Sequence, residues 1–271
     1  MARFKKPRNN ILGRAPIVLL VCFNSLAQTT ETPHQTVQRV KGIGLSAKTV
    51  DQVEPLLEKA VQGWADLNPR DLEYAQALTM LGMVRQFFAD VDIPRLRNNV
   101  EPIYKKALSV YDRSMLPPAP ADLALTLELE AGVLNAIGEV QEATFLSERA
   151  ISIRKERVRE IQEGAVRITT AYKPDEGISA PTISARSEPA YTSEARFLRV
   201  QGAVGLRFVV DEKGLPQDIS LVQSLGYGLD ENAVRAVRTW RFLPGKDESG
   251  KPLPTIVNME INFKPESPRE P

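Results

Sequence analysis

The chain has 271 residues, of which 42% are hydrophobic and 25% charged, a composition typical of a soluble globular protein with one large or two small domains. Five of its 35 basic residues lie in the first fourteen positions, which leaves 30 basic against 34 acidic residues, or about −4, in the rest. This mildly acidic body excludes nucleic acid as the main partner. The single cysteine, Cys22, and the single histidine, His34, exclude a disulfide framework and a transition-metal site.

Residues 1–27 have the three-part order of a secretory signal peptide. A basic segment is followed by the apolar run Ala15–Phe23 and then by Asn-Ser-Leu-Ala, which ends at Ala27. The run is shorter than the roughly 20 residues that a membrane-spanning helix needs, so cleavage after Ala27 is expected. Two alternatives stay open, an uncleaved marginal anchor in the inner membrane and a lipid attached to Cys22. All three predict export to the periplasm.

A linker is expected over residues 28–46, with His34 solvated within it, and helices are expected over residues 47–163. Three helical segments resemble one another at offsets of 47 and 43 residues: Val53–Ala60, Val100–Ala107 and Ala143–Ala150. Further helices are expected over Leu72–Ala89 and Ala121–Ile137. The pattern resembles tetratricopeptide repeats, which implies an array of helical pairs that offers an interaction surface.

Side chains within these helices give three further expectations. Pro55 and Pro102 hold matching positions and are expected in the first turn of a helix or at a kink, because proline removes a hydrogen bond elsewhere in a helix. A mid-helix glycine costs about 1 kcal/mol relative to alanine, so Gly82 and Gly132 are expected where a neighbouring helix packs too closely for a side chain. Five aromatic residues are expected in the core rather than on a recognition surface: Trp64, Phe87, Phe88, Tyr104 and Tyr111.

A second linker is expected over residues 164–188, a C-terminal domain over residues 189–264 and a disordered tail over residues 265–271. The domain is expected to begin with a helix over Tyr191–Val200 that ends at Gly202. The expected order then continues as strand, turn, strand, helix and strand: Ala203–Asp211, Gly214, Gln217–Ser224, Leu229–Trp240 and Pro254–Phe263. Alternating strands and an amphipathic helix predict a three-stranded antiparallel sheet with two helices, so the chain is expected to be α+β.

The C-terminal domain carries an ordered series of motifs. They run GAVGLRFVVDEKG, SLGYGLDENAVRAV, TWRFLPG and GKP, followed by a last strand that ends in phenylalanine. This series resembles the C-terminal domain of TonB-type energy transducers, in which a long proline- and lysine-rich spacer stands where this chain has helices. The resemblance implies that the matched residues shape the fold as turns, core and caps. These residues are Gly202, Phe208, Gly214, Ser224, Gly226, Leu229, Asp230, Ala233, Trp240, Phe242, Pro244 and Phe263.

The resemblance also implies that the domain binds an extended segment of a partner protein along its last strand. Edge strands offer unpaired N–H and C=O groups for such pairing. The expected contact residues are Ile256, Asn258, Glu260 and Asn262. The implied partner of this periplasmic protein is a TonB-dependent outer-membrane receptor or transporter, or another envelope component. The alternatives are that the strand only completes the fold or that it pairs with a second copy in a homodimer.

A second function stays open, in which the helical repeats form the active surface of an envelope scaffold. The C-terminal domain would then only anchor or dimerise the chain, without energy transduction. Catalysis is not expected, because the acid pairs Asp230-Glu231 and Asp247-Glu248 have no base or nucleophile beside them in the sequence. No cofactor is expected, and inner-membrane association would depend on the N-terminal segment.

Overall fold

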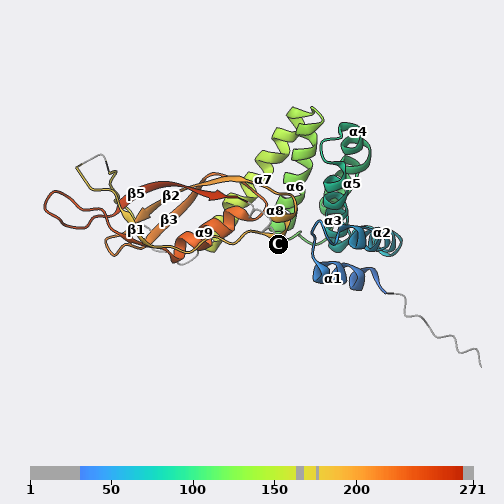
Figure 1. The fold of residues 1–271 in the computed structure, drawn as a ribbon, viewed down its shortest axis with the longest axis horizontal. Helices are drawn as coiled ribbons and strands as arrows, with labels where there is room; N and C mark the ends of the chain where they lie inside the picture. Colours follow the sequence, from blue (N-terminus) through green and yellow to red (C-terminus); the bar gives the residue numbers. More distant parts are fainter. Residues whose placement is uncertain (1–30, 163–167, 175–176, 265–271) are drawn as a thin grey trace, which may run out of the picture. The chain divides into compact units, whose positions relative to one another are not determined.

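The computed structural model describes residues 31–162, 168–174 and 177–264. The predicted signal peptide, residues 1–27, and the predicted tail, residues 265–271, lie outside these ranges. In the described ranges, the residues from Thr32 onward form one compact unit, which begins with helices and continues with strands (Figure 1). None of the helices described there is both long and apolar enough to cross a bilayer.

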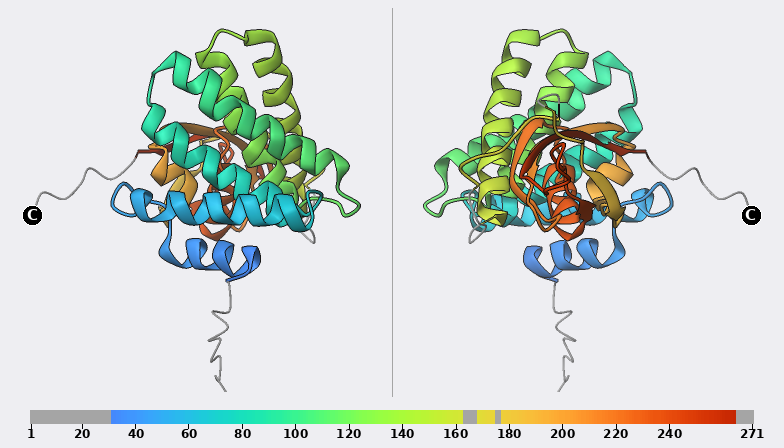
Figure 2. Two further views of the ribbon diagram at one scale, coloured as in Figure 1. Left: turned by 90° about the vertical axis from the view of Figure 1, so that its right-hand side faces the viewer. Right: turned by 90° about the vertical axis from the view of Figure 1, so that its left-hand side faces the viewer.

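Helices make up the first part of this unit, and each packs on the next. Their bounds are α1 Pro33–Ile43, α2 Val50–Leu67, α3 Leu72–Ala89, α4 Ile93–Arg95, the π-helical turn η1 Leu96–Val100, α5 Glu101–Arg113, α6 Pro120–Ala136 and α7 Val140–Ile161. Contacts join α1 to α2, α2 to α3, α3 to α5, α5 to α6 and α6 to α7. Both views in Figure 2 show α6 and α7, coloured green, side by side.

Helix α1 corrects the prediction of a linker over residues 28–46. Thr32 and Gln35 form a capping box, in which the Thr32 hydroxyl accepts the Gln35 N–H and the Gln35 side chain accepts the Thr32 N–H. Val37 and Val40 are fully buried on the inner face of this helix. The capped first turn and the buried valines together explain why this polar stretch is helical.

His34 and Pro55 lie in other surroundings than expected. His34 belongs to α1, and its exposed ring places Nδ1 2.7 Å from the Glu73 carboxylate, so it is not a solvated linker residue. Pro102 lies in the first turn of α5, as predicted. Pro55 lies inside α2, which begins at Val50, so its predicted place in the first turn is wrong and the alternative of a kink there stays a prediction. Val50 is buried, and this burial offsets the hydrogen bond that proline removes.

The prediction that the aromatic residues are core residues is confirmed for four of the five. Tyr104 and Tyr111 are buried, and the partly buried Trp64 and Phe87 pack against the apolar clusters of the helices. Phe88 is 43% exposed, so the prediction is wrong for this residue. Phe88 is the penultimate residue of α3, and its ring contacts that of Phe87 edge to face at a centroid distance of 5.8 Å.

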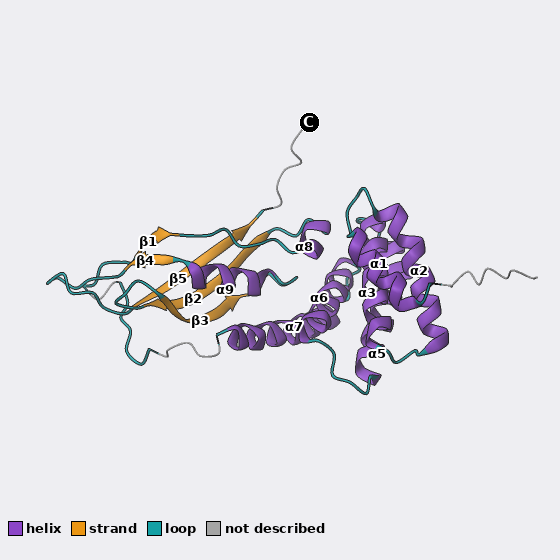
Figure 3. Ribbon diagram, turned by 90° about the horizontal axis from the view of Figure 1, so that it is seen from below, coloured by secondary structure: helices purple, strands orange, loops and turns teal. Residues whose placement is uncertain are grey.

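Strands form the second part of the unit, and the predicted α+β fold is confirmed. Three antiparallel strands lie in the order β3-β2-β5, with helices α8 and α9 (Figure 3). The bounds are β1 Thr182–Ala185, α8 Ser193–Phe197, β2 Gly202–Val210, β3 Pro216–Gln223, α9 Leu229–Thr239, β4 Arg241–Leu243 and β5 Thr255–Phe263. A separate two-stranded pair, β1 with β4, is not expected from the sequence, and β1 lies within the predicted linker 164–188. Gly202 begins β2 instead of ending a helix, because α8 already ends at Phe197.

The helices and the sheet share apolar contacts. Phe197 of α8 is buried in the core of the helices, where its ring stacks on Phe87 at a centroid distance of 5.0 Å. Val158 of α7 is buried in the core of the sheet. Helix α7 also contacts both α9 and β3. The last helix of the array therefore contributes to both cores.

Substitution by alanine is expected to have opposite effects on stability at Gly82 and at Gly132. A Cβ at Gly82 would collide with the buried ring of Tyr104, which confirms the expected close helix contact. At exposed Gly132 the nearest atom to such a Cβ is the Tyr227 hydroxyl at 3.9 Å, so the expectation of a close helix is wrong there. We expect Gly82→Ala to lower the free energy of unfolding by about 1–3 kcal/mol and Gly132→Ala to raise it by about 0.5–1 kcal/mol. Urea unfolding measures both changes, and a stabilised Gly82→Ala variant would contradict the packing argument.

Candidate functional site

Strand β5 lies at an edge of the three-stranded sheet, with β2 on one side only. Backbone groups of successive residues in an antiparallel strand point to opposite sides. The Ile256 N–H points away from β2, since it donates to the Tyr172 carbonyl at 2.8 Å. By this alternation, the N–H and C=O groups of Asn258, Glu260 and Asn262 also point away from β2. Within the described ranges, no backbone group pairs with these three residues on that side.

The side chains of β5 alternate in the same register. The inward side chains pack on the core of the sheet, whereas Asn258, Glu260 and Asn262 are exposed. The structure therefore brings three of the four predicted contact residues together on one open edge. Ile256 differs, because it is half-buried and its outward N–H is already bonded to Tyr172, a residue of the predicted linker.

At the opposite edge of the sheet, a side chain just after α7 pairs with Ile219 of β3. The Gln162 Oε1 accepts the Ile219 N–H at 2.7 Å, and the Gln162 Nε2 donates to the Ile219 carbonyl. A primary amide has the donor and the acceptor of a peptide group, so it satisfies the backbone at mid-strand as a neighbouring strand would. Helix α7 also packs against β3. In the described ranges, Gln162 and α7 therefore obstruct the middle of the β3 edge, whereas the outward backbone groups of Asn258, Glu260 and Asn262 on β5 have no backbone partner.

The residues of the C-terminal motif lie in turns, core positions and one cap. Gly214 adopts φ 79° in the turn between β2 and β3, and a Cβ there would collide with the Phe242 carbonyl. Asp230 is buried and accepts the Leu225 N–H at 2.8 Å and the Ser224 hydroxyl at 2.5 Å, which holds the loop before α9. Pro244 is half-buried, and Gly202 and Gly226 adopt positive φ. The buried core members are Phe208, Leu229, Ala233, Trp240, Phe242 and Phe263.

A buried ion network joins the helices to this loop. Arg154 of α7 donates two hydrogen bonds to the Glu128 carboxylate of α6, at 2.8 and 2.9 Å, and one to Glu231 of α9 at 3.0 Å. The three side chains are only 2%, 11% and 5% exposed, respectively. Glu128 also accepts the Tyr227 N–H at 2.7 Å. We call Arg154, Glu128 and Glu231 the Arg154 network.

Burial dominates the electrostatics around this network. It raises the pKa of the Glu128 and Asp230 carboxyls, against the opposing effect of the hydrogen bonds that each accepts and of Arg154. Burial alone would lower the pKa of Arg154, but Glu128 and Glu231 raise it above its usual value, so the guanidinium stays charged. The pattern of charged residues in the sequence gives no sign of this network, because a helix such as α7 carries many solvated charges.

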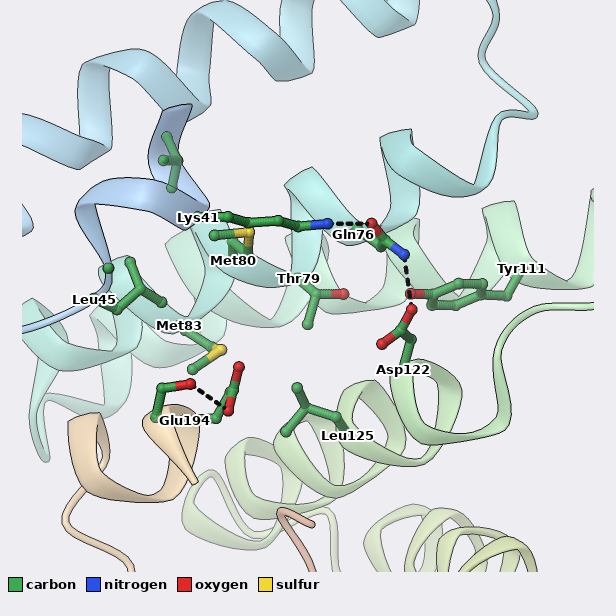
Figure 4. A pocket seen from close by; sticks show the side chains of 13 residues that line it. Lys41, Leu45, Gln76, Thr79, Met80, Met83, Tyr111, Asp122, Leu125 and Glu194 are labelled. Atoms are coloured by element: carbon green, nitrogen blue, oxygen red, sulfur yellow. Dashed lines mark hydrogen bonds between the residues drawn. The ribbon is translucent and has the colours of Figure 1, made fainter. Parts of the chain in front are cut away.

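A cavity of about 370 Å³ opens among α1, α3, α5, α6 and α8 (Figure 4). On its polar side, the Lys41 ammonium donates to Gln76 at 3.1 Å, and the Gln76 amide donates to Asp122 at 2.7 Å. The apolar lining includes Val40, Leu45, Met80, Met83 and Leu125. Such a mixture of an apolar wall and a few converging polar groups is typical of a ligand site.

Glu130 of α6 is a fully buried carboxyl that the sequence does not single out. Neither of its oxygens has a hydrogen-bond partner in the described part of the chain. Burial raises the pKa of Glu130 from 4.5 to about 8; the nearby Glu101 adds to this increase, and Lys105 opposes it. The carboxyl is therefore mostly protonated in the folded protein at neutral pH.

Comparison with known proteins finds matches in the C-terminal part of the chain. The family described as Gram-negative bacterial TonB protein C-terminal matches residues 187–265, which follow α1–α7. "Protein TonB" of Escherichia coli (strain K12) is 33% identical over 82 residues, which cover 30% of this chain and 33% of that protein. "Protein TonB" of Klebsiella pneumoniae is 30% identical over 98 residues, which cover 35% of this chain and 38% of that protein. The chain thus spans about a third of the length of these curated relatives.

Loss of the Arg154 guanidinium would leave two carboxylates buried without a counter-charge. We expect Arg154→Met to lower the free energy of unfolding by about 3–5 kcal/mol. Arg159→Met, which removes an exposed ion pair on the same helix, is the control and should change it by less than about 0.5 kcal/mol. The two tryptophans, Trp64 in α2 and Trp240 after α9, report on the helices and the sheet separately in single-tryptophan forms. Unchanged midpoints for both reporters in Arg154→Met would contradict a stabilising role of the network.

The buried Glu130 predicts a loss of stability as the pH rises. The folded protein retains the Glu130 proton up to about pH 8, whereas the unfolded chain releases it near the ordinary pKa of 4.5. The free energy of unfolding should therefore fall between these two pH values, and this loss is complete above the folded pKa. We expect Glu130→Gln to stabilise the protein by about 3–5 kcal/mol at pH 9 and to leave it little changed at pH 4.5. Glu148→Gln, at an exposed position of α7, is the control, and parallel pH profiles of wild type and Glu130→Gln would refute the assignment.

Proposed function

Because residues 187–265 form a C-terminal domain of the TonB family, we propose that the chain is an exported envelope protein that binds a partner protein through this domain. The proposed partner is an outer-membrane transporter or another envelope component, and an extended segment of it pairs with the outer edge of β5. The observation that carries the proposal is the set of outward backbone groups of Asn258, Glu260 and Asn262, which have no backbone partner among the described residues.

Strand pairing suits the chemistry of this edge. The three outward residues offer three N–H donors and three C=O acceptors, and a net contribution of about 1 kcal/mol for each hydrogen bond is typical. Backbone pairing supplies affinity in this mode of recognition, while the exposed side chains of alternate residues supply specificity. Gln162 and α7 obstruct strand addition at the middle of β3, which favours pairing at β5.

The periplasm is the proposed location. The basic, apolar and small residues of segment 1–27 follow the order of a signal peptide, which supports export of the chain. Cleavage after Ala27 would release a soluble periplasmic protein. Retention of the segment would instead keep the chain at the inner membrane.

A scaffold function is the second candidate, and the cavity among the helices supports it. In this case the helical pairs over residues 47–163, proposed as tetratricopeptide-like repeats, hold the partner. The C-terminal domain then anchors or dimerises the chain. Helices α1, α3, α5 and α6 line the cavity together with α8 of the C-terminal domain, so a ligand there would contact both parts of the chain.

Proline at Asn258 tests the proposed edge directly. The Asn258 N–H points away from β2, so proline there removes no hydrogen bond of the sheet, but it removes a donor to the partner and its ring obstructs the incoming strand. We expect Asn258→Pro to lower partner binding at least tenfold and to leave the unfolding midpoint nearly unchanged. Asn258→Ala, which keeps the N–H, is the matched control and should retain most of the binding. The measurement is quantitative recovery of envelope proteins on the tagged full chain.

Two outcomes of this experiment separate the candidate functions. Equal recovery of partners by a folded Asn258→Pro variant would exclude β5 as the binding edge. If the same partners are lost when the cavity is filled by Leu125→Trp, the scaffold function is supported instead.

A further inference from the structure

A segment of the predicted linker occupies one end of the β5 edge. Residues 168–174 run from β3 to β5: the Ile168 N–H donates to the Asp218 carboxylate at 2.7 Å, and Tyr172 forms a parallel bridge with Thr255. At this bridge the Tyr172 N–H donates to the Pro254 carbonyl at 2.9 Å, and the Tyr172 carbonyl accepts the Ile256 N–H at 2.8 Å. We call residues 168–174 the strap.

The strap limits the length of edge that a partner can use. Ile256 is the first outward residue of β5, and its N–H is already paired with the strap. In the part of the chain that the structure describes, the outward residues without a backbone partner are Asn258, Glu260 and Asn262. At a strand rise of about 3.3 Å per residue they span about 13 Å, which matches about five residues of an incoming strand.

The open part of the edge carries one negative charge. Glu260 is exposed, and the part of the chain that the structure describes contains no hydrogen bond or ion pair of its side chain. Its cross-strand neighbour on β2 is Gly205, which has no side chain to cover it. Arg207 of β2 is exposed and faces Asn258, so it lies only diagonally to Glu260. The directly opposed side chain comes from the incoming strand, and an opposite charge is favoured at that position.

A second copy of the chain fits this edge poorly. If two β5 strands paired antiparallel over the same open residues, each Asn258 would face an Asn262, and the two Glu260 carboxylates would face each other. Like charges in directly opposed positions destabilise strand pairing. The negative charge of Glu260 therefore favours pairing with a different protein over pairing with a second copy of this chain.

We propose that Tyr172 acts as a register stop, so that the partner is an extended segment of another protein that pairs over about five residues and places a lysine or arginine beside Glu260. This inference rests on the proposed function, since it takes the outer edge of β5 as the binding surface. The strap sets where the pairing ends, and Glu260 selects a partner segment with a positively charged side chain at the opposed position.

Three labelled peptides of sequence Ser-Thr-Val-Xaa-Val-Thr-Ser test the charge, with lysine, glutamine or glutamate at the central position. We expect the full chain to bind the lysine peptide about threefold more tightly than the glutamine peptide and the glutamate peptide more weakly still, as measured by fluorescence anisotropy. Glu260→Lys should reverse this order. Equal affinities of the three peptides would overturn the charge assignment.

Amide hydrogen exchange, followed by NMR on the same samples, tests the register stop. In the free chain the Ile256 amide should exchange slowly, and the amides of Asn258, Glu260 and Asn262 should exchange fast and be slowed by the lysine peptide. In the double variant Tyr172→Pro/Asp218→Gly, which releases both ends of the strap, the Ile256 amide should exchange fast until peptide is added, and affinity should rise about tenfold. Tyr172→Ala, which keeps the backbone bridge, is the control.

The outcomes distinguish this inference from the function on which it rests. If the peptides slow the three open amides but the strap variant binds no more tightly, the register stop is overturned and the binding edge stands. If no peptide slows these amides and Asn258→Pro still recovers partners, both are overturned.

Discussion

The guanidinium of Arg154 joins the two parts of this protein. It is almost fully buried between a carboxylate of the helices, Glu128, and a carboxylate of the C-terminal domain, Glu231. Removing three charges from water is costly, and the cost is offset only while all three remain together. A Cβ at Gly226 would lie 2.8 Å from the Glu128 carboxyl carbon, so the glycine of the loop before α9 also makes room for this approach. The position of the sheet on the helices therefore depends on this buried ion network and on the absence of a side chain at Gly226, in addition to the apolar contacts of Phe197 and Val158.

The proposed binding edge is bounded by contacts of two residues near the end of α7 and in the strap. Gln162 follows α7 directly and pairs with Ile219 of β3, while Tyr172 pairs with Ile256, the first outward residue of β5. Both residues belong to the junction between the helices and the sheet. The segment that connects the helices to the sheet therefore also determines which backbone groups at the edges of the sheet lack a hydrogen-bond partner in the described part of the chain.

Much of the fold could be predicted from the sequence because its longer elements have clear periods and end signals. Helix α3 has the predicted bounds, and α9 and β5 differ from the predicted bounds by one residue each. The resemblance of the C-terminal motifs to the TonB family is confirmed by the family match over residues 187–265. Strands β1 and β4 could not be predicted from the sequence. They have four and three residues, respectively, which are too few to show an alternating pattern.

The candidate site could be predicted only in part, for a physical reason. The alternation of β5 points to Asn258, Glu260 and Asn262, since side-chain exposure and outward backbone direction share one register. Tyr172 and Arg154 could not be found in this way. Tyr172 makes a single bridge outside any strand, and the partner of Arg154 on α9 lies 77 positions away in the sequence. Contacts of this kind depend on the tertiary fold and leave no local pattern.

The pairing of Gln162 with the outer edge of β3 has a consequence for assembly. Growth of a fibre by strand addition requires each molecule to receive a strand on one edge and to offer the other edge to the next molecule. On β3, the Gln162 amide already occupies the position at Ile219 where a second neighbouring strand would pair, and α7 packs beside it. Addition of a strand to β5 is therefore not readily followed by a second addition on β3, which lowers the tendency of the protein to polymerise through its sheet.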